Sequence, residues 1–426
     1  MNAAWLSLSA LVIIILISRH ERINVGILAM GLAWMIGTFS VGMTTPEIIQ
    51  LFPWSLFIIL FGITLFFGIA QSNGTLEHIT RLMIHSARGN SLILPINIFI
   101  LAVLLSMIGP GNIGAVALLA PFVMPLAGRL GIKAFFITII LVTGANAGTF
   151  SPFAPTGIIA DLLTSRFGLE MNPWTQIFLP AFLVQAFVAL ICYLILVGSM
   201  RKNPALLHFD VDKILGAPKH LTGFHLITLT AIAGLMVGAI FFRLDIGFLA
   251  ISLAALLMVF GVSNGDEAFK AVPWNIIMLV CGVSTLVGLM EKTGGLNLFT
   301  EALAKVSSPT SVTGMIALLT GIISTYSSSS GVVMPAFIPI VPDLVEKVGG
   351  NPASIVASIN VGSHLVDVSP LSTLGAICIA NAAPGEDKKK LFRHLLIFGL
   401  SMAMVGGGLC YLFFGLLPHW FPAFHM

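Results

Sequence analysis

Apolar runs of the length that crosses a lipid bilayer follow one another along almost the whole chain. A helix needs about 20 predominantly apolar residues to span the hydrocarbon core. Only 9% of the 426 residues are charged while 57% are hydrophobic, which leaves too little charge for a water-facing surface. The sequence therefore predicts an all-α integral membrane protein with about ten spans. These fall near residues 3–18, 24–42, 51–71, 133–163, 173–200, 221–240, 244–262, 273–290, 352–381 and 390–417.

Two further apolar segments are each interrupted by a small polar cluster. Segment 91–130 contains GPGN at 109–112, and segment 309–348 contains STYSSSSG at 324–331. Each segment could form two ordinary spans or one re-entrant hairpin, and the polar centres favour hairpins. The spans at 133–163 and 352–381 are also interrupted, which predicts two broken helices.

The distribution of Lys and Arg predicts the orientation in the membrane. With ten spans, the 20 Lys and Arg residues divide into fifteen on one side and five on the other. The basic side is expected to be cytoplasmic, with both termini outside the cell and the protein in the cytoplasmic (inner) membrane. The run DKKK at 387–390 is interpreted as part of this topology signal.

An internal repeat divides the chain into two halves. Residues 53–80 align without gaps with residues 273–300, and seven of the 28 positions are identical. A second match pairs residues 144–157 with residues 362–375. Because five spans separate equivalent positions, the repeats should have inverted topology. The predicted units are a first repeat at 1–200 with the hairpin 91–130, a cytoplasmic linker at 201–220, and a second repeat at 221–426 with the hairpin 309–348.

The four polar interruptions point to a binding site near the middle of the membrane. An unwound helix frees carbonyl oxygens that can bind a cation, while the next half-helix points free N–H groups at an anion. Such a site can hold a carboxylate beside a cation. The polar candidates for substrate binding are Asn112, Thr156, Ser327, Ser328, Ser329, Ser330, Ser372 and Thr373. Those for cation binding or coupling are Asn146, Thr149, Ser151, His364, Asp367 and Ser369.

Asp367 and His364 are the side chains in these clusters that can readily carry charge near neutral pH. Asp367 could ligate a cation, carry a proton, or cap the half-helix that opens at Ser369. His364 could be functional or a packing residue. Because no Lys or Arg occupies the clusters, we expect helix termini, hydroxyls, amides and bound cations to hold a small organic dianion. No cofactor is expected, and Na⁺ is the candidate coupling ion.

Three stretches resemble the MatC-type dicarboxylate (malonate) carriers, which are relatives of the divalent anion:sodium symporters in the ion transporter superfamily. These are VPWNIIMLVCGVSTLVGLMEKTGGLNLFT, TGIISTYSSSSGVVMPAFIP and INVGSHLVDVSPLSTLGAICIANA. The resemblance implies a dicarboxylate substrate, an elevator mechanism and a homodimer. The hairpins and broken helices would move together against a scaffold of the other spans.

In the symporter relatives each hairpin tip carries a Ser-Asn-Thr signature that contacts carboxylate and sodium. By spacing to the downstream proline, the first tip here is Gly111, Asn112 and Ile113, and Gly111 joins the substrate candidates. The second tip is Thr325, Tyr326 and Ser327, so only Asn112 matches the signature in type and place.

The resulting hypothesis is a secondary transporter for malonate or a C4-dicarboxylate, coupled to Na⁺ or H⁺. The alternatives are another anion, arsenite or ion exchange on the same fold, and the membrane subunit of a binding-protein-dependent system. An intramembrane hydrolase built on Ser369 is disfavoured, because the repeat partner of that stretch lacks both ionisable groups. The chain is therefore expected to be no enzyme and to have no nucleic-acid partner.

Overall fold

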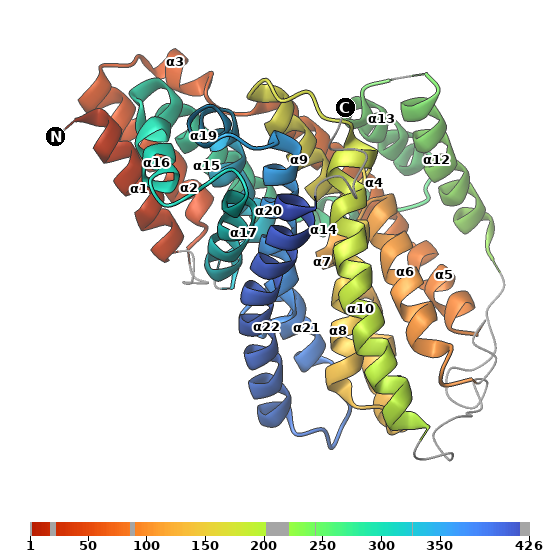
Figure 1. The fold of residues 1–426 in the computed structure, drawn as a ribbon. Coiled ribbons are helices and arrows are strands. Elements are labelled where there is room, and N and C mark those ends of the chain that lie inside the picture. The colour runs from red at the N-terminus through yellow and green to blue at the C-terminus, as the bar shows by residue number, and fades with distance from the viewer. Residues whose placement is uncertain are drawn as a thin grey trace.

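The computed structural model describes residues 2–17, 23–85, 90–201, 221–242, 244–325 and 327–417. Over these residues the chain is built of helices and contains no β-strand (Figure 1). The all-helical class predicted from the apolar runs is therefore confirmed. The predicted linker at 201–220 lies, apart from Arg201, outside the described residues.

The helices of the two halves follow one another in the same order. The first half contains α1 (Ala3–Ile17), α2 (Val25–Ile36), η1 (Gly37–Val41), α3 (Thr45–Ile49), α4 (Trp54–Ser72), α5 (Thr75–His85), α6 (Leu94–Ile108), α7 (Gly111–Arg129), α8 (Ala134–Gly148), α9 (Pro155–Arg166), η2 (Pro173–Phe178) and α10 (Leu179–Met200). The second half begins with α12 (Gly223–Ile240), α13 (Ile246–Val259), α14 (Gly265–Ala271), α15 (Trp274–Thr293), α16 (Gly295–Ala304) and α17 (Ser311–Ser324). It continues with η4 (Ser329–Val333), α18 (Met334–Phe337), η5 (Ile338–Ile340), α19 (Val341–Val348), α20 (Pro352–Leu365), η6 (Val366–Val368), α21 (Thr373–Ala380), α22 (Lys388–Cys410) and η7 (Tyr411–Leu416).

Six helical segments of the described chain are long and apolar enough to cross a membrane. The other apolar helices, among them α1, α6, α8 and α17, are shorter. Five of the ten predicted spans are among the six long segments. The predicted spans at 3–18, 24–42, 221–240 and 244–262 are continuous but shorter apolar helices, and the run 133–163 is divided by the break after α8. The six segments are Trp54–Ser72, Gly111–Arg129, Pro173–Met200, Trp274–Thr293, Pro352–Ala380 and Lys388–Leu416.

The two predicted hairpins differ in their second limb. In the first, α6 and α7 are joined by a tight turn at Gly109 and Pro110, and α7 is a continuous helix with two internal prolines. In the second, α17 is followed by the short pieces η4, α18, η5 and α19. Pro335, Pro339 and Pro342 provide a reason for this division, because each removes a backbone donor from the helix.

Both predicted broken helices are broken in the structure. The first ends as α8 at Gly148 and resumes as α9 at Pro155. Proline is favoured in the first turn, where its missing N–H has no helical partner. The second ends as α20 at Leu365, passes through the turn η6, and resumes as α21 at Thr373.

Glycines that are identical between the two halves lie where helices cross closely. A Cβ on Gly62 of α4 would lie 2.3 Å from the carbonyl oxygen of Gly247 on α13. A Cβ on Gly282 of α15 would lie 2.0 Å from the carbonyl oxygen of Gly26 on α2. Small residues let membrane helices approach until their backbones touch. Each half therefore packs its long helix against the other half through a matched glycine contact.

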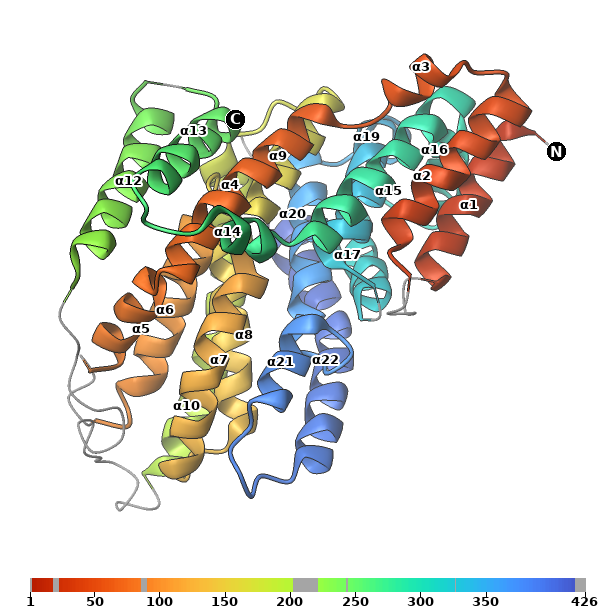
Figure 2. The same ribbon diagram turned by 180° about the vertical axis from the view of Figure 1, so that it is seen from behind.

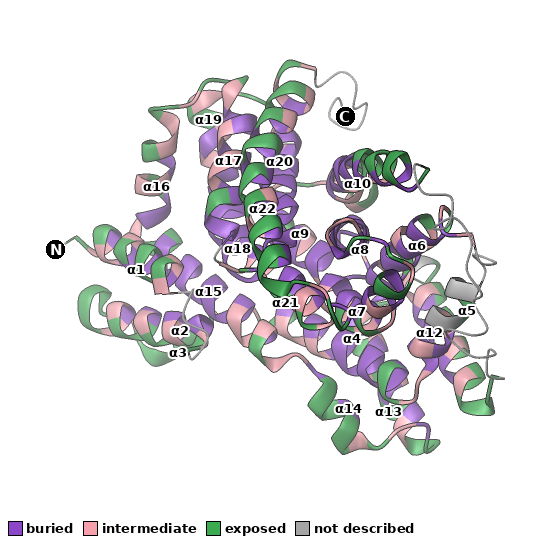
Figure 3. Ribbon diagram, turned by 90° about the horizontal axis from the view of Figure 1, so that it is seen from below, coloured by how far each residue is buried: buried purple, intermediate pink, exposed green. Residues whose placement is uncertain are grey.

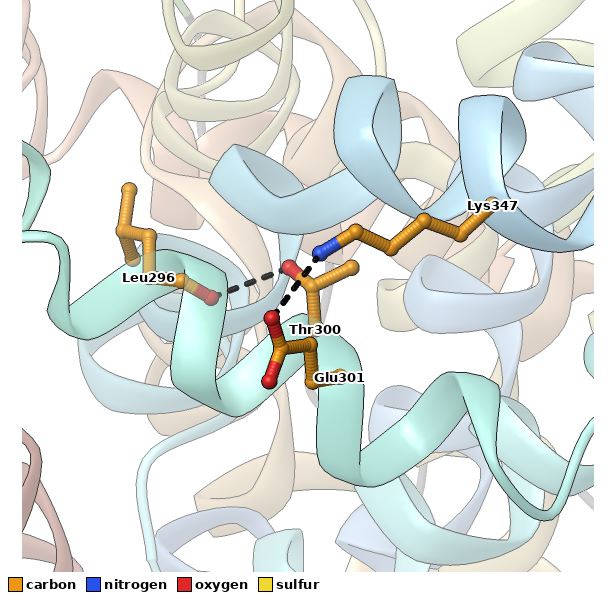
Figure 4. Close-up of polar contacts among 4 residues, drawn as sticks. All are labelled: Leu296, Thr300, Glu301 and Lys347. Atoms are coloured by element: carbon orange, nitrogen blue, oxygen red, sulfur yellow. Dashed lines mark hydrogen bonds and ion pairs between the residues drawn. The ribbon is translucent and has the colours of Figure 1, made fainter.

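A second pair of identical glycines ends helices. Gly74 has φ of 80° after α4, and Gly294 has φ of 77° as the cap of α15. Glycine adopts this left-handed conformation without the steric cost that a Cβ imposes. The chain then turns into α5 and α16, which are short amphipathic helices. Helix α16 is tied to α19 by the ion pair of Glu301 with Lys347, whose charged atoms are 3.9 Å apart (Figure 4).

Burial is arranged as expected for a protein surrounded by lipid. Figure 3 shows buried residues where helices α8, α17 and α20 face their neighbours, and exposed residues on the outer sides of α14 and α22. Many exposed residues are large and apolar, among them Phe187 and Leu194 on α10 and Ile397 and Met404 on α22. An apolar outer surface of this extent requires a covering, which a bilayer provides.

Replacing Gly282 by Ala should destabilise the protein, because the new Cβ would collide with the backbone of α2. We expect this overpacking to cost about 1–3 kcal/mol, measured as a lower midpoint of thermal unfolding in detergent. Gly31→Ala is the matched control, since no atom lies within 4 Å of its Cβ position. Equal midpoints for the two variants would contradict close packing at Gly282.

Candidate functional site

The four interrupted segments come together in the interior of the molecule. Asn112, next to the first hairpin tip, donates from Nδ2 to Oδ1 of Asn146 on α8 at 2.8 Å. Asn146 in turn donates to the backbone oxygen of His364 on α20 at 2.7 Å. Ser329, in the second hairpin, donates to Asp367 beyond α20 at 2.8 Å. Hydrogen bonds therefore connect both hairpins and both broken helices.

The carboxylate of Asp367 is the centre of this network. Its Oδ1 accepts from the hydroxyls of Ser329 at 2.8 Å and Ser372 at 3.4 Å. Its Oδ2 accepts from Nδ2 of Asn146 at 3.3 Å. Asp367 is only 4% exposed, and a buried carboxylate needs such donors to offset its lost hydration. Each donor belongs to a different segment, so one side chain holds three segments together.

Ser329 has more oxygen neighbours than its single hydrogen can satisfy. Its Oγ lies 2.8 Å from Oδ1 of Asp367, 3.0 Å from the backbone oxygen of Ser363, and 2.6 Å from Oγ of Ser324. Two hydroxyls supply two hydrogens for three short oxygen–oxygen contacts. At least one contact therefore lacks a hydrogen, and a proton or a small cation would relieve this deficit.

The first half supplies a simpler polar cluster made of neutral groups. The backbone N–H of Asn112 donates to Oγ1 of Thr149 at 3.3 Å, and Thr149 donates to Thr156 across the break at 3.0 Å. Ser151 donates to the backbone oxygen of Met107, which ties the break to the first hairpin. Gly111, with φ of 67°, closes the tip. This cluster positions Asn112 without using a charged side chain.

His364 is fully buried beside this centre. Its Nδ1 lies 2.9 Å from the hydroxyl of Ser363 and 3.0 Å from the backbone oxygen of Asn360. Its ring meets the ring of Phe150 edge-on, with centroids 4.7 Å apart. Nε2 has no hydrogen-bond partner among the described residues. The imidazole ring is therefore packed against Phe150, while its Nε2 remains available for a hydrogen bond.

A cavity of about 790 Å³ lies against this network. Asp367 is the one acidic residue among its lining residues, and no Lys or Arg is among them. The polar lining is concentrated at the tips and breaks, while α21 and Phe392 of α22 supply the apolar part. The lining residues are Asn112, Ile113, Ser327, Ser328, Ser329, Ser330, His364, Asp367, Pro370, Leu371, Ser372, Thr373, Leu374, Ala376, Ile377, Ala380 and Phe392.

The predicted residues divide into those that line the cavity and those that lie behind its wall. The lining includes all substrate candidates except Gly111 and Thr156, and it also includes His364 and Asp367. Asn146 and Thr149 lie behind the wall and hold Asn112 and Asp367. Ser151 and Ser369 bond to nearby backbone, and Ser369 also packs against α22 at Gly399. Tyr326 of the second tip lies outside the described residues.

Two polar residues of this centre were missing from the sequence-based candidates. Ser324 contacts Ser329, and Asn360 is fully buried with neither amide atom hydrogen-bonded among the described residues. Asn360 precedes His364 by one helical turn. An amide side chain within an apolar span is a sequence signal that could have identified it as part of the polar centre. Asn360 was overlooked because it lies outside the Gly- and Pro-rich clusters.

Comparison with known proteins identifies related transporters. Two uncharacterized transporters of Mycobacterium tuberculosis (strain H37Rv) are 25% identical over 323 residues and 26% identical over 321 residues. These alignments cover 71% and 70% of this chain, and the same shares of the two relatives.

A solved structure shares the fold. The crystal structure of the YdaH transporter from Alcanivorax borkumensis, described as having an unusual topology, superposes with a TM-score of 0.57 at 17% identity. The superposition covers 91% of this chain and 89% of that one. Residues 1–149 match the family model described as the N-terminus of dicarboxylate carrier protein MatC. The resemblance to MatC-type carriers indicated by the sequence is therefore confirmed, and over its first 149 residues the chain matches that family.

Proposed function

We propose that this chain is a secondary active transporter that moves a small dicarboxylate, such as malonate or a C4-dicarboxylate, across the cytoplasmic membrane. The observation that carries the proposal is the meeting of two hairpins and two broken helices at one cavity. The named relatives and the fold neighbour support a multi-pass membrane transporter rather than an enzyme. The family match over residues 1–149 supports the dicarboxylate.

The membrane arrangement is part of this proposal. The two halves would be inverted repeats, with both termini outside the cell and the linker at 201–220 in the cytoplasm. The matched glycine contacts of α4 with α13 and of α15 with α2 support a pseudo-symmetric scaffold. The hairpins with α8 to α10 and α20 to α22 would form the moving body of an elevator, usually assembled as a homodimer.

The electrostatics of the cavity support coupling to a cation. A dianion near the ionised carboxylate of Asp367 would be repelled, and no Lys or Arg of the lining compensates. A proton on Asp367, or Na⁺ among the oxygens around Ser329, would remove this repulsion. It would also relieve the oxygen–oxygen contact around Ser329 that lacks a hydrogen. Transport of the anion would then require the cation, which is the basis of symport.

Purified protein in liposomes should take up labelled malonate, succinate or malate when an Na⁺ or H⁺ gradient is imposed. We expect accumulation to stop when the driving gradient is collapsed by an ionophore, because the cation is bound together with the anion. Empty liposomes provide the background. Absence of uptake for all three anions under both gradients would refute the dicarboxylate proposal, and labelled arsenite tests the alternative cargo.

Asp367→Asn should uncouple transport while preserving the shape of the site. The amide can still contact Ser329 and Asn146 but cannot carry the coupling charge. We expect gradient-driven accumulation to fall to passive equilibration, measured as the final internal-to-external ratio of labelled substrate. Asp266→Asn on α14, far along the chain from the site, removes the same charge as a control. Full gradient-driven accumulation by Asp367→Asn would exclude Asp367 as the coupling residue.

Asn112→Ala should weaken substrate binding with little effect on the coupling ion. The change removes an amide that lines the cavity and bonds to Asn146. One net hydrogen bond is worth about 1 kcal/mol, so KM should rise about threefold to tenfold. Initial uptake rates over a range of substrate concentrations measure this, and Asn275→Ala, which changes an exposed amide outside the cavity lining, is the control. A KM equal to that of the unmodified protein would remove Asn112 from the substrate site.

A further inference from the structure

One face of α21 forms a path from the polar centre to the surface. Ser372, Ala376 and Ala380 recur at intervals of four residues, and all three line the cavity. On this face of α21 Ser372 is half-buried, while Ala376 and Ala380 are exposed. The cavity therefore reaches the surface at the end of α21, where the chain turns into α22 (Figure 2).

A lysine lies at this rim of the cavity. Nζ of Lys388 donates to the backbone oxygen of Ala380 at 3.1 Å, and Ala380 is a lining residue. Phe392, one helical turn after Lys388 on α22, also lines the cavity. Residues four apart share a helix face. Lys388 is therefore held at the mouth by one lining residue and lies on the same face of α22 as another.

The charges of neighbouring residues do not cancel the positive charge of Lys388. Asp387 turns its carboxylate to the N-terminus of α22, where Oδ1 accepts from the N–H of Lys390 at 3.0 Å. Glu386 precedes it, while Lys389 and Arg393 add positive charge. Lys389 is rotated about 100° around α22 from Lys388, so it belongs to another face of the helix. The net charge of this turn is positive.

We propose that Lys388 is an anion-selective residue at the mouth of the cavity. Its ammonium raises the local concentration of small anions at the opening and lowers that of cations. This inference rests on the proposed carriage of anions for its biological purpose, and it goes beyond the topology signal assigned to DKKK. Lys388 attracts the substrate outside a binding site that contains no Lys or Arg of its own. The substrate class it favours is the small carboxylate anion.

A charge-labelled accessibility experiment tests this role without requiring transport. The four native cysteines are buried, so a single Ala376→Cys change introduces one exposed thiol on the path. The thiol is modified with an anionic and a cationic methanethiosulfonate reagent of similar size, and the two rates are measured. Their ratio reports the potential at the mouth, because other effects on access change both rates together.

Lys388→Gln should lower the ratio of anionic to cationic rate. In water, a unit charge about 7 Å from a singly charged reagent would change each rate about threefold, and therefore the ratio about tenfold. The effect should shrink in 1 M salt, where charges are screened over about 3 Å. Lys388→Arg should retain the ratio, and Lys389→Gln, the matched control on another face of the helix, should change it much less.

An unchanged ratio in Lys388→Gln, or an equal change in Lys389→Gln, would overturn the proposal. A ratio that falls in Lys388→Gln and is retained in Lys388→Arg would exclude a role limited to capping α21, because loss of the cap would change both rates together. The readout is also separate from the proposed function. Failure of liposome uptake would refute dicarboxylate transport and leave the ratio interpretable, whereas an unchanged ratio would refute the mouth residue alone.

Discussion

The buried carboxylate of Asp367 is the constraint on which the polar centre depends. It lies where four segments leave helical geometry, and it accepts hydrogen bonds from Ser329, Ser372 and Asn146. In a low-dielectric interior such a carboxylate is costly unless each oxygen has a donor. The donors come from segments that must stay together for the charge to remain satisfied. Separating the second hairpin from α20 would remove the Ser329 donor from this charge.

The surrounding helices are arranged so that these breaks can exist inside a membrane. Backbone groups that leave a helix at this depth need partners, and they find them in Thr149, Ser151 and neighbouring carbonyls. Helices α2, α4, α13 and α15 form a frame around these breaks. This frame is packed through backbone contacts, as at Gly62 with Gly247 and at Gly282 with Gly26. Close packing of this kind leaves little room for adjustment within the frame. The broken helices are thus the part of the fold where polar groups remain available to bind a ligand or an ion.

Charge is distributed along the cavity in a way that suits an anion with a cationic companion. The mouth carries Lys388 held against Ala380, and the base carries Asp367 with an oxygen-rich neighbour, Ser329. Between them the lining is neutral. An anion is attracted at the surface by the positive mouth and meets a negative charge at the base. The proposed carrier would therefore be selective for anions at its opening and dependent on a cation at its centre.

The sequence by itself determined the helical class, the four polar interruptions, and the glycines shared by the two halves, because these follow from local hydropathy and backbone conformation. It identified Asp367 and Asn112 but could not pair Asn112 with Asn146, or Asn146 with Asp367, since such contacts join residues far apart in the chain. Ser324 and Asn360 were missed, and several of the ten predicted spans are shorter helices than the six segments that are long enough to cross a membrane. Only the tertiary structure decided which hydroxyls reach the cavity and placed Lys388 at its rim, because packing between distant helices sets those distances.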